Sequence, residues 1–137
     1  MIDVADRMAI HELFALYGHI IDERRWSEME LVFTDDVTYD ATDFGHEITT
    51  SLDALRTHWT SDLSMHPLAH HATNIVVTED ADGTVRVLSK GIGVGPNGRV
   101  GSAVYRDVVV PTSAGWRLRH RRAELRRPAS PEPDLVQ

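Results

Sequence analysis

The sequence predicts an α+β fold in which N-terminal helices pack on a curved, mostly antiparallel sheet. Three observations lead to this prediction. Apolar residues recur at helical spacing in the first half, strand-like runs separated by short turns fill the second half, and small residues line one face of two neighbouring strands. A length of 137 residues corresponds to one domain, which we place at residues 1–127.

Three helices are expected before the main sheet. The first carries an apolar stripe at three- and four-residue spacing, formed by Ile10, Leu13, Phe14, Tyr17 and Ile21. Ser27 followed by Glu30 is a capping-box pattern, which predicts a short second helix reaching Phe33. A third helix is expected to begin near Thr50 or Ser51. Its buried side chains are expected to be Leu52, Leu55 and Trp59.

Five strands are expected, one between the second and third helices and four after the third. They are placed at residues 37–41, 70–78, 84–94, 99–110 and 116–125. Asp82-Gly83 is a strong hairpin signal, and Pro96-Asn97-Gly98 and Ser113-Ala114-Gly115 mark two further turns. Residues 128–137 are rich in proline and poor in apolar groups, so we expect a flexible tail or a lid ordered by a partner.

Glycine is unusually placed in the third and fourth of these strands. Because strand side chains alternate, one face of the third carries Ser89, Gly91, Gly93 and Gly95, and one face of the fourth carries Gly101, Ala103, Tyr105 and Asp107. Such faces predict a strongly curved sheet whose concave side holds a helix or a ligand. The alternative is that the small residues only permit curvature or a subunit contact. Residues 93–98 match G-x-G-x-x-G, but a hairpin follows where dinucleotide binding requires a helix.

Composition excludes several classes of protein. The chain has no cysteine, which excludes disulfides, thiolate metal sites and thiol catalysis. A net charge of −7 argues against general nucleic-acid binding. No segment approaches the about 20 apolar residues of a membrane span. Two acids precede the first base at the N-terminus, unlike a secretory signal, so a cytoplasmic location is expected.

Tyr17 and Asp22 are candidate functional residues near the end of the first helix. Five residues turn an ideal helix by about 140°, so the two side chains do not share a face. They would converge only if the helix loosened after Gly18 or if Asp22 lay just beyond its end. The alternatives are a core aromatic residue and a surface or capping acid.

His70 and His71 begin the second expected strand. His70 and Asn74 share one face of that strand, whereas His71 points to the other face, which argues against a metal site made of both histidines and an aspartate. An imidazole is suited to acid–base work near neutral pH, and Asp22 could orient it. The alternative is a hydrogen-bonded histidine that lines the sheet. The other histidines fit no ligand spacing, and we interpret them as incidental: His11, His19, His46, His58 and His66.

The last strand carries a row of arginines. Arg117, Arg119 and Arg121 alternate with Trp116, Leu118 and His120, so the arginines are most simply a solvated or subunit-facing strip. A bulge could turn one of them, best Arg121, toward a pocket, where a guanidinium is suited to bind an anion.

Taken together, these motifs resemble the SnoaL-like branch of the nuclear transport factor 2-like superfamily, over residues 5–125. The resemblance is closest to the scytalone dehydratase and bile acid 7α-dehydratase group. It is carried by the order and spacing of Tyr17, Asp22, Trp26, residues 31–37, His70-His71-x-x-Asn74, Tyr105-x-Asp107, residues 115–118 and Arg121. The family fold is a cone-shaped, cystatin-like α+β barrel around an apolar pocket, in agreement with the curved sheet expected from the glycines.

The resemblance also implies an active centre. By motif, Tyr17, Asp22 and His70 match the catalytic residues of the dehydratases. The residues expected to contact the substrate are Asn74, Tyr105, Tyr39, Trp59 and Arg121. His70 would remove a proton next to a carbonyl, Asp22 would orient and charge-balance it, and Tyr17 would donate a hydrogen bond. The product would be an enone or an aromatised ring from a small hydrophobic substrate, without cofactor or metal.

Other functions remain open. A polyketide cyclase is one, and a non-catalytic ligand-binding or association subunit, as in aromatic-ring dioxygenase β subunits, is another. Related ketosteroid isomerases place a catalytic acid where this chain has Ala41, with Asp40 one residue earlier, which argues against that reaction. The resemblance also predicts a homodimer or homotrimer, and no nucleic-acid or membrane partner is expected.

Overall fold

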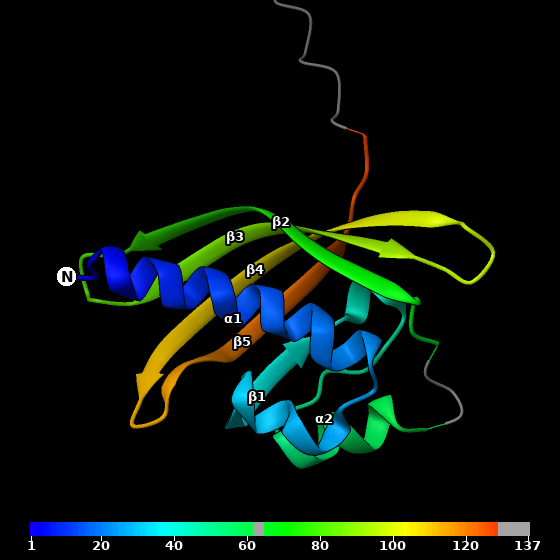
Figure 1. The fold of residues 1–137 in the computed structure, drawn as a ribbon, viewed down its shortest axis with the longest axis horizontal. Helices are drawn as coiled ribbons and strands as arrows, with labels where there is room; N and C mark the ends of the chain where they lie inside the picture. The colour runs from blue at the N-terminus through cyan, green and yellow to red at the C-terminus, as the bar shows by residue number, and fades with distance from the viewer. Residues whose placement is uncertain (62–64, 129–137) are drawn as a thin grey trace, which may run out of the picture.

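A computed structural model describes residues 1–61 and 65–128 (Figure 1). The helices are α1 (Val4–Asp22) and α2 (Leu52–Trp59), with 3₁₀ turns η1 (Trp26–Leu31) and η2 (Thr42–Phe44). The strands are β1 (Phe33–Asp40), β2 (Ala69–Glu79), β3 (Val85–Val94), β4 (Val100–Thr112) and β5 (Gly115–Leu125). Apart from residue 128, the expected C-terminal tail lies outside the described residues.

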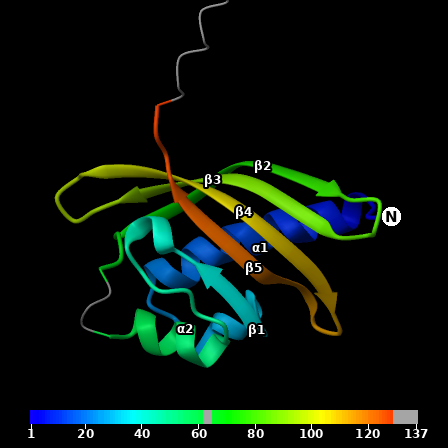
Figure 2. The ribbon, with the colours of Figure 1, turned by 180° about the vertical axis from the view of Figure 1, so that it is seen from behind.

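The five strands form one curved sheet in the order β1-β5-β4-β3-β2. β1 runs parallel to β5, and all other neighbours are antiparallel. Helix α1 lies across one face of the sheet, against β2 and β5 (Figure 1), and the view from behind shows β5 and β4 in front of it (Figure 2). The predicted α+β fold with a curved, mostly antiparallel sheet is confirmed. None of the helices among residues 1–61 and 65–128 combines the length and apolarity needed to cross a bilayer.

Helix α1 begins at a capping box that Asp3 and Asp6 form together. The Asp3 carboxylate accepts from the Asp6 backbone N–H, and the Asp6 carboxylate accepts from the Asp3 backbone N–H. The predicted stripe, together with Gly18 and Ile20, is buried against the sheet. Gly18 is required where α1 meets β2, because a Cβ there would lie 2.8 Å from the carbonyl oxygen of His70.

The second predicted helix is wrong in its cap and in its end. The turn η1 begins after Arg25, without a side-chain cap, so Ser27 does not act as predicted. Phe33 does not end a helix but begins β1, where it pairs with Leu118 of β5. The Leu118 N–H also donates to the carbonyl oxygen of Val32 at 2.8 Å. This parallel pairing joins segments far apart in the chain, so local sequence patterns do not reveal it.

A bulge in β5 changes which of its side chains are buried. Val108 pairs with His120 and Val109 pairs with Leu118, which leaves Arg119 as an extra residue. Beyond it the alternation shifts, so that Leu118 and Arg121 are both fully buried. The simplest prediction, that all three arginines lie on one outer face, is wrong. The considered alternative is confirmed in its bulge, which turns Arg121 into the core.

Gly91 of β3 makes room for the ring of Tyr105 on β4, since a Cβ at Gly91 would lie 2.4 Å from Cε2 of that ring. We expect Gly91→Ala to lower the free energy of unfolding by about 1–3 kcal/mol, the cost typical of overpacking. Gly101→Ala is the matched control, because nothing lies within 4 Å of the added Cβ. Urea unfolding followed by circular dichroism compares the two. Equal stability of both variants would contradict the account.

Candidate active site

A cavity of about 1240 Å³ opens between the end of α1, helix α2 and the glycine-rich ends of β3 and β4. Six aromatic side chains line it: Tyr17, Trp26, Tyr39, Phe44, Trp59 and Tyr105. Four histidines line it as well: His46, His58, His66 and His70. The glycines of β3 and β4 therefore border a cavity.

His70 lines one end of this cavity and pairs with Asp22 behind it. The Nδ1 atom of His70 lies 2.6 Å from Oδ1 of Asp22, and the His70 backbone N–H donates to Oδ2 at 3.0 Å. The carboxylate therefore holds both the ring and the strand that carries it. Because a carboxylate only accepts, Nδ1 carries a proton and Nε2 is the nitrogen left for a ligand. The side chain of His70 is 14% exposed and that of Asp22 is 24% exposed. His71 is exposed and does not line the cavity, in agreement with the alternation that put the two histidines on opposite faces. That His70 is the one facing the cavity is decided by the structure alone.

Tyr17 and Asp22 lie on either side of His70 although they do not share a helix face. Helix α1 neither loosens after Gly18 nor ends before Asp22, so neither condition considered from the sequence is needed. Instead, the missing side chain of Gly18 lets the His70 backbone contact the helix between them. The Tyr17 ring then lies 6.5 Å from the His70 ring, centroid to centroid, in an edge-on arrangement.

Tyr17 and Tyr39 share a hydrogen bond 3.0 Å long between their hydroxyls. Burial raises the pKa of Tyr17 well above its usual value and that of Tyr39 to about 12. Burial raises the pKa of Tyr105 as well. All three phenols thus stay protonated at neutral pH and act as hydrogen-bond donors, which leaves His70 as the base of this group.

Arg121 lies behind the tyrosines. Its Nε and Nη2 donate to the two Asp107 oxygens at 2.8 and 2.9 Å, and both side chains are 0% exposed. The guanidinium carbon is 3.9 Å from the centroid of the Tyr105 ring and 4.3 Å from that of Tyr17, a cation–π arrangement. Burial alone would lower the pKa of Arg121, but Asp107 and the tyrosine oxygens outweigh it and raise that pKa well above its usual value. The expectation that Arg121 contacts the substrate is wrong in this geometry, because the residue does not line the cavity.

Asn74 is also misplaced by the sequence argument. The β2–β3 register shifts between Thr73 and Val76, and Asn74 adopts a positive φ of 55° in this bulge. Its side chain is exposed and outside the cavity lining. The alternation that placed it beside His70 holds only in a regular strand. Tyr39, Trp59 and Tyr105 do line the cavity, as expected of substrate-contacting residues.

Three of the histidines that fitted no ligand spacing in the sequence line the cavity. The His46 and His58 rings lie 5.0 Å apart, and the His66 ring lies 5.2 Å from Trp26 and 5.6 Å from Trp59. Burial lowers the pKa of His66. These residues come from a loop, from α2 and from the segment before β2, so no local spacing could have joined them.

Ala41 lines the cavity, and the neighbouring Asp40 accepts from the backbone and side chain of Thr42. Within the described parts of the chain, no three His, Asp or Glu side chains group as they would around a metal ion.

Comparisons with known proteins agree with the fold described above. A protein from Novosphingobium aromaticivorans proposed to be an aromatic ring hydroxylase is 28% identical, with 95% of each chain covered and a TM-score of 0.70. A proposed scytalone dehydratase from the same species is 18% identical, covering 90% of this chain and 86% of that one, with a TM-score of 0.69.

A cystatin-like protein from Nostoc punctiforme reaches a TM-score of 0.75 at 21% identity, with 98% of this chain and 97% of that chain covered. No curated protein matches the chain significantly. The family model of the SnoaL-like domain matches residues 3–122. The chain therefore belongs to the SnoaL-like family, within the nuclear transport factor 2-like superfamily.

Proposed function

We propose that this protein is an acid–base enzyme of the dehydratase or isomerase type that acts on a hydrophobic ring ketone. The observation that carries the proposal is the His70–Asp22 pair, 2.6 Å between Nδ1 and Oδ1, at the wall of an aromatic cavity. Protonated Tyr17 lies beside it, with its ring centroid 6.5 Å from that of His70, and its hydroxyl shares a hydrogen bond with that of Tyr39. A base and hydroxyl donors around one cavity are what proton abstraction next to a carbonyl requires.

The proposed reaction begins with removal of a proton from the carbon next to the carbonyl by Nε2 of His70. Asp22 stabilises the imidazolium, and a tyrosine hydroxyl donates to the oxygen on which negative charge develops. Cleavage of the C–O bond at the β carbon then restores the carbonyl, and the imidazolium gives its proton to the departing hydroxide. The products are water and an enone. Return of the proton to another carbon would instead complete an isomerisation.

A polyketide cyclase is the second candidate, since the same enolate could attack a carbonyl within its own chain. The cavity volume favours it, because about 1240 Å³ exceeds the roughly 300–1,000 Å³ of typical ligand sites and admits more than one ring. A non-catalytic binding domain shares the cavity but needs no base.

Proton exchange tests the proposal without knowledge of the leaving group. Cyclic β-hydroxyketones of one to four rings are incubated in D₂O, and deuterium at the α carbon is followed by NMR and water loss by enone absorbance. We expect wild-type protein to catalyse exchange of at least one of them. Asp22→Asn keeps the size of the side chain but loses its charge, so we expect the rate to fall by about 10²-fold.

Glu23→Gln is the matched control, since it removes the neighbouring carboxylate, which is exposed and outside the cavity lining. Its exchange rate should equal that of the wild type. Absence of exchange with every ketone, or an unchanged rate in Asp22→Asn, would exclude the proposed function and favour a binding domain.

A further inference from the structure

The cavity is rich in basic groups although the protein as a whole is acidic. The net charge is −7. The side chains of arginine and histidine that line the cavity are Arg24, His46, His58, His66, His70 and Arg99. Among the described lining residues, Glu47 is the single acid, and it is exposed. A cavity whose described lining holds two arginines, four histidines and one exposed acid is suited to attract an anionic ligand.

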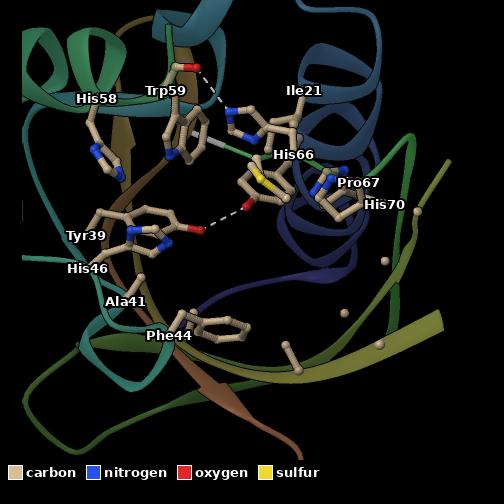
Figure 3. Close-up of a pocket in the computed structure, with 18 of the residues that line it drawn as sticks. Ile21, Tyr39, Ala41, Phe44, His46, His58, Trp59, His66, Pro67 and His70 are labelled. Carbon is tan, nitrogen blue, oxygen red and sulfur yellow. Dashed lines mark hydrogen bonds between the residues drawn. The ribbon is translucent and has the colours of Figure 1, made fainter. Parts of the chain in front are cut away.

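His46 and His58 form a defined pair within this lining. Their ring centroids lie 5.0 Å apart with 69° between the planes. Figure 3 shows both near Tyr39, on the far side of the cavity from His70 and Pro67. The pair is therefore separate from the proposed catalytic base, and one ligand in the cavity could contact both ends.

Tertiary contacts hold the segments that carry the two histidines, of which His46 is exposed and His58 half-buried. His58 lies on α2, whose neighbouring Leu55 and Trp59 are buried in the core. The segment that carries His46 is held by an isolated bridge, in which Tyr39 and Thr49 exchange backbone hydrogen bonds of 2.8 and 3.1 Å. Thr49 lines the cavity as well, and its buried hydroxyl has no hydrogen-bond partner among the described residues.

We propose that His46 and His58 form a carboxylate-binding subsite, so that the ligand is an anionic compound of two or more rings. A carboxylate offers two acceptor oxygens, and an imidazole donates an N–H in either protonation state. Hydrogen bonds accepted by a carboxylate from charged or polar donors are stronger than those accepted by a neutral amide. We expect the reacting carbonyl at the opposite end of the same ligand, and this expectation rests on the function proposed for His70. The carboxylate subsite itself does not rest on that function.

Binding of two matched probes tests the subsite. Naphthalene-2-carboxylate and the neutral 2-naphthamide have the same ring system and nearly the same size. We expect titration calorimetry to show the carboxylate binding at least about tenfold more tightly to wild-type protein, a difference of about 1.4 kcal/mol. In the double variant His46→Gln/His58→Gln the preference should fall to about twofold or less, with the Kd of the amide unchanged.

The matched control is His11→Gln/His71→Gln, which removes two exposed histidines outside the cavity lining and should keep the preference. The proposal is overturned if wild-type protein does not bind the carboxylate at millimolar concentration or shows no preference for it. It is also overturned if His46→Gln/His58→Gln keeps the preference, or if Arg99→Gln alone abolishes it.

The two proposals fail separately. His70→Gln should keep the preference for the carboxylate, because His70 lies at the other end of the cavity. A preserved preference without proton exchange on any ketone would exclude the enzyme and leave the subsite standing. Proton exchange without any carboxylate preference would exclude the subsite and leave the proposed enzyme standing.

Discussion

Replacing Asp107 by alanine is expected to lower the free energy of unfolding by about 3–5 kcal/mol. Arg121 and Asp107 are both 0% exposed and joined by two hydrogen bonds of 2.8 and 2.9 Å. Removal of the carboxylate leaves a charged guanidinium in the core, where the aromatic rings around it replace little of its lost hydration. Urea unfolding followed by circular dichroism measures the loss.

Two comparisons separate burial from charge. Glu124→Ala breaks an exposed ion pair with Arg106 on the same two strands and should cost less than about 1 kcal/mol. Asp107→Ala/Arg121→Met removes both buried charges and should recover part of the stability that Asp107→Ala loses. The account is wrong if Asp107→Ala costs no more than Glu124→Ala, or if the double variant is less stable than the single one.

His70→Gln is expected to lower the rate of α-proton exchange by about 10²–10⁴-fold, the range typical of a general base. Glutamine can still accept from a ligand or donate to Asp22, but its amide does not take up a proton near neutral pH. Binding of a neutral ring compound should change little, since the aromatic walls remain. The rate is measured by NMR in D₂O on whichever ketone the wild type accepts.

His71→Gln is the matched control for this change. His71 is the next residue on β2, but its side chain is exposed on the other face and outside the cavity. Its exchange rate should match that of the wild type. An equal loss in both variants would point to damage of the strand, and no loss in His70→Gln would remove the residue from the mechanism.

The buried Arg121–Asp107 pair lies next to the tyrosines of the proposed active site. The positive charge of Arg121 opposes the effect of burial on the pKa of Tyr17 and Tyr39, although burial prevails. The charge therefore makes both hydroxyls better donors than burial alone would allow. In the proposed mechanism Arg121 is a positioning residue that acts through these rings, since it does not line the cavity.

Much of the fold follows from local patterns. The apolar stripe of α1 and the hairpin signals at Asp82-Gly83 and Pro96-Asn97-Gly98 were sufficient for the helix and the antiparallel strands. The start of β1 at Phe33 was missed, because its partner Leu118 is distant in the chain and parallel pairing leaves no turn to detect. The predicted cap at Ser27 is wrong because a capping-box pattern shows only that a local hydrogen bond can form. It does not show where the helix begins.

The candidate site, too, was predictable from the sequence only in part. Strand alternation distinguished His70 from His71, because the two neighbours must point to opposite faces of a regular strand. It failed at Asn74 and at the arginines of β5, since a single extra residue in each strand reverses the alternation beyond it. His46, His58 and His66 were missed because they meet only after a loop, α2 and the segment before β2 have packed together.

By itself, the sequence determined the class of fold, the glycines that line one face of β3 and β4, and the placement of His70 and His71 on opposite faces of β2. These depend on the period of a helix or strand and on the bulk of single side chains, which are local properties. Only the tertiary structure decided that Gly18 brings His70 to Asp22, that Arg121 is buried under the tyrosines, and that further histidines line the cavity. Each of these depends on register and packing between distant segments, which no short stretch of sequence specifies.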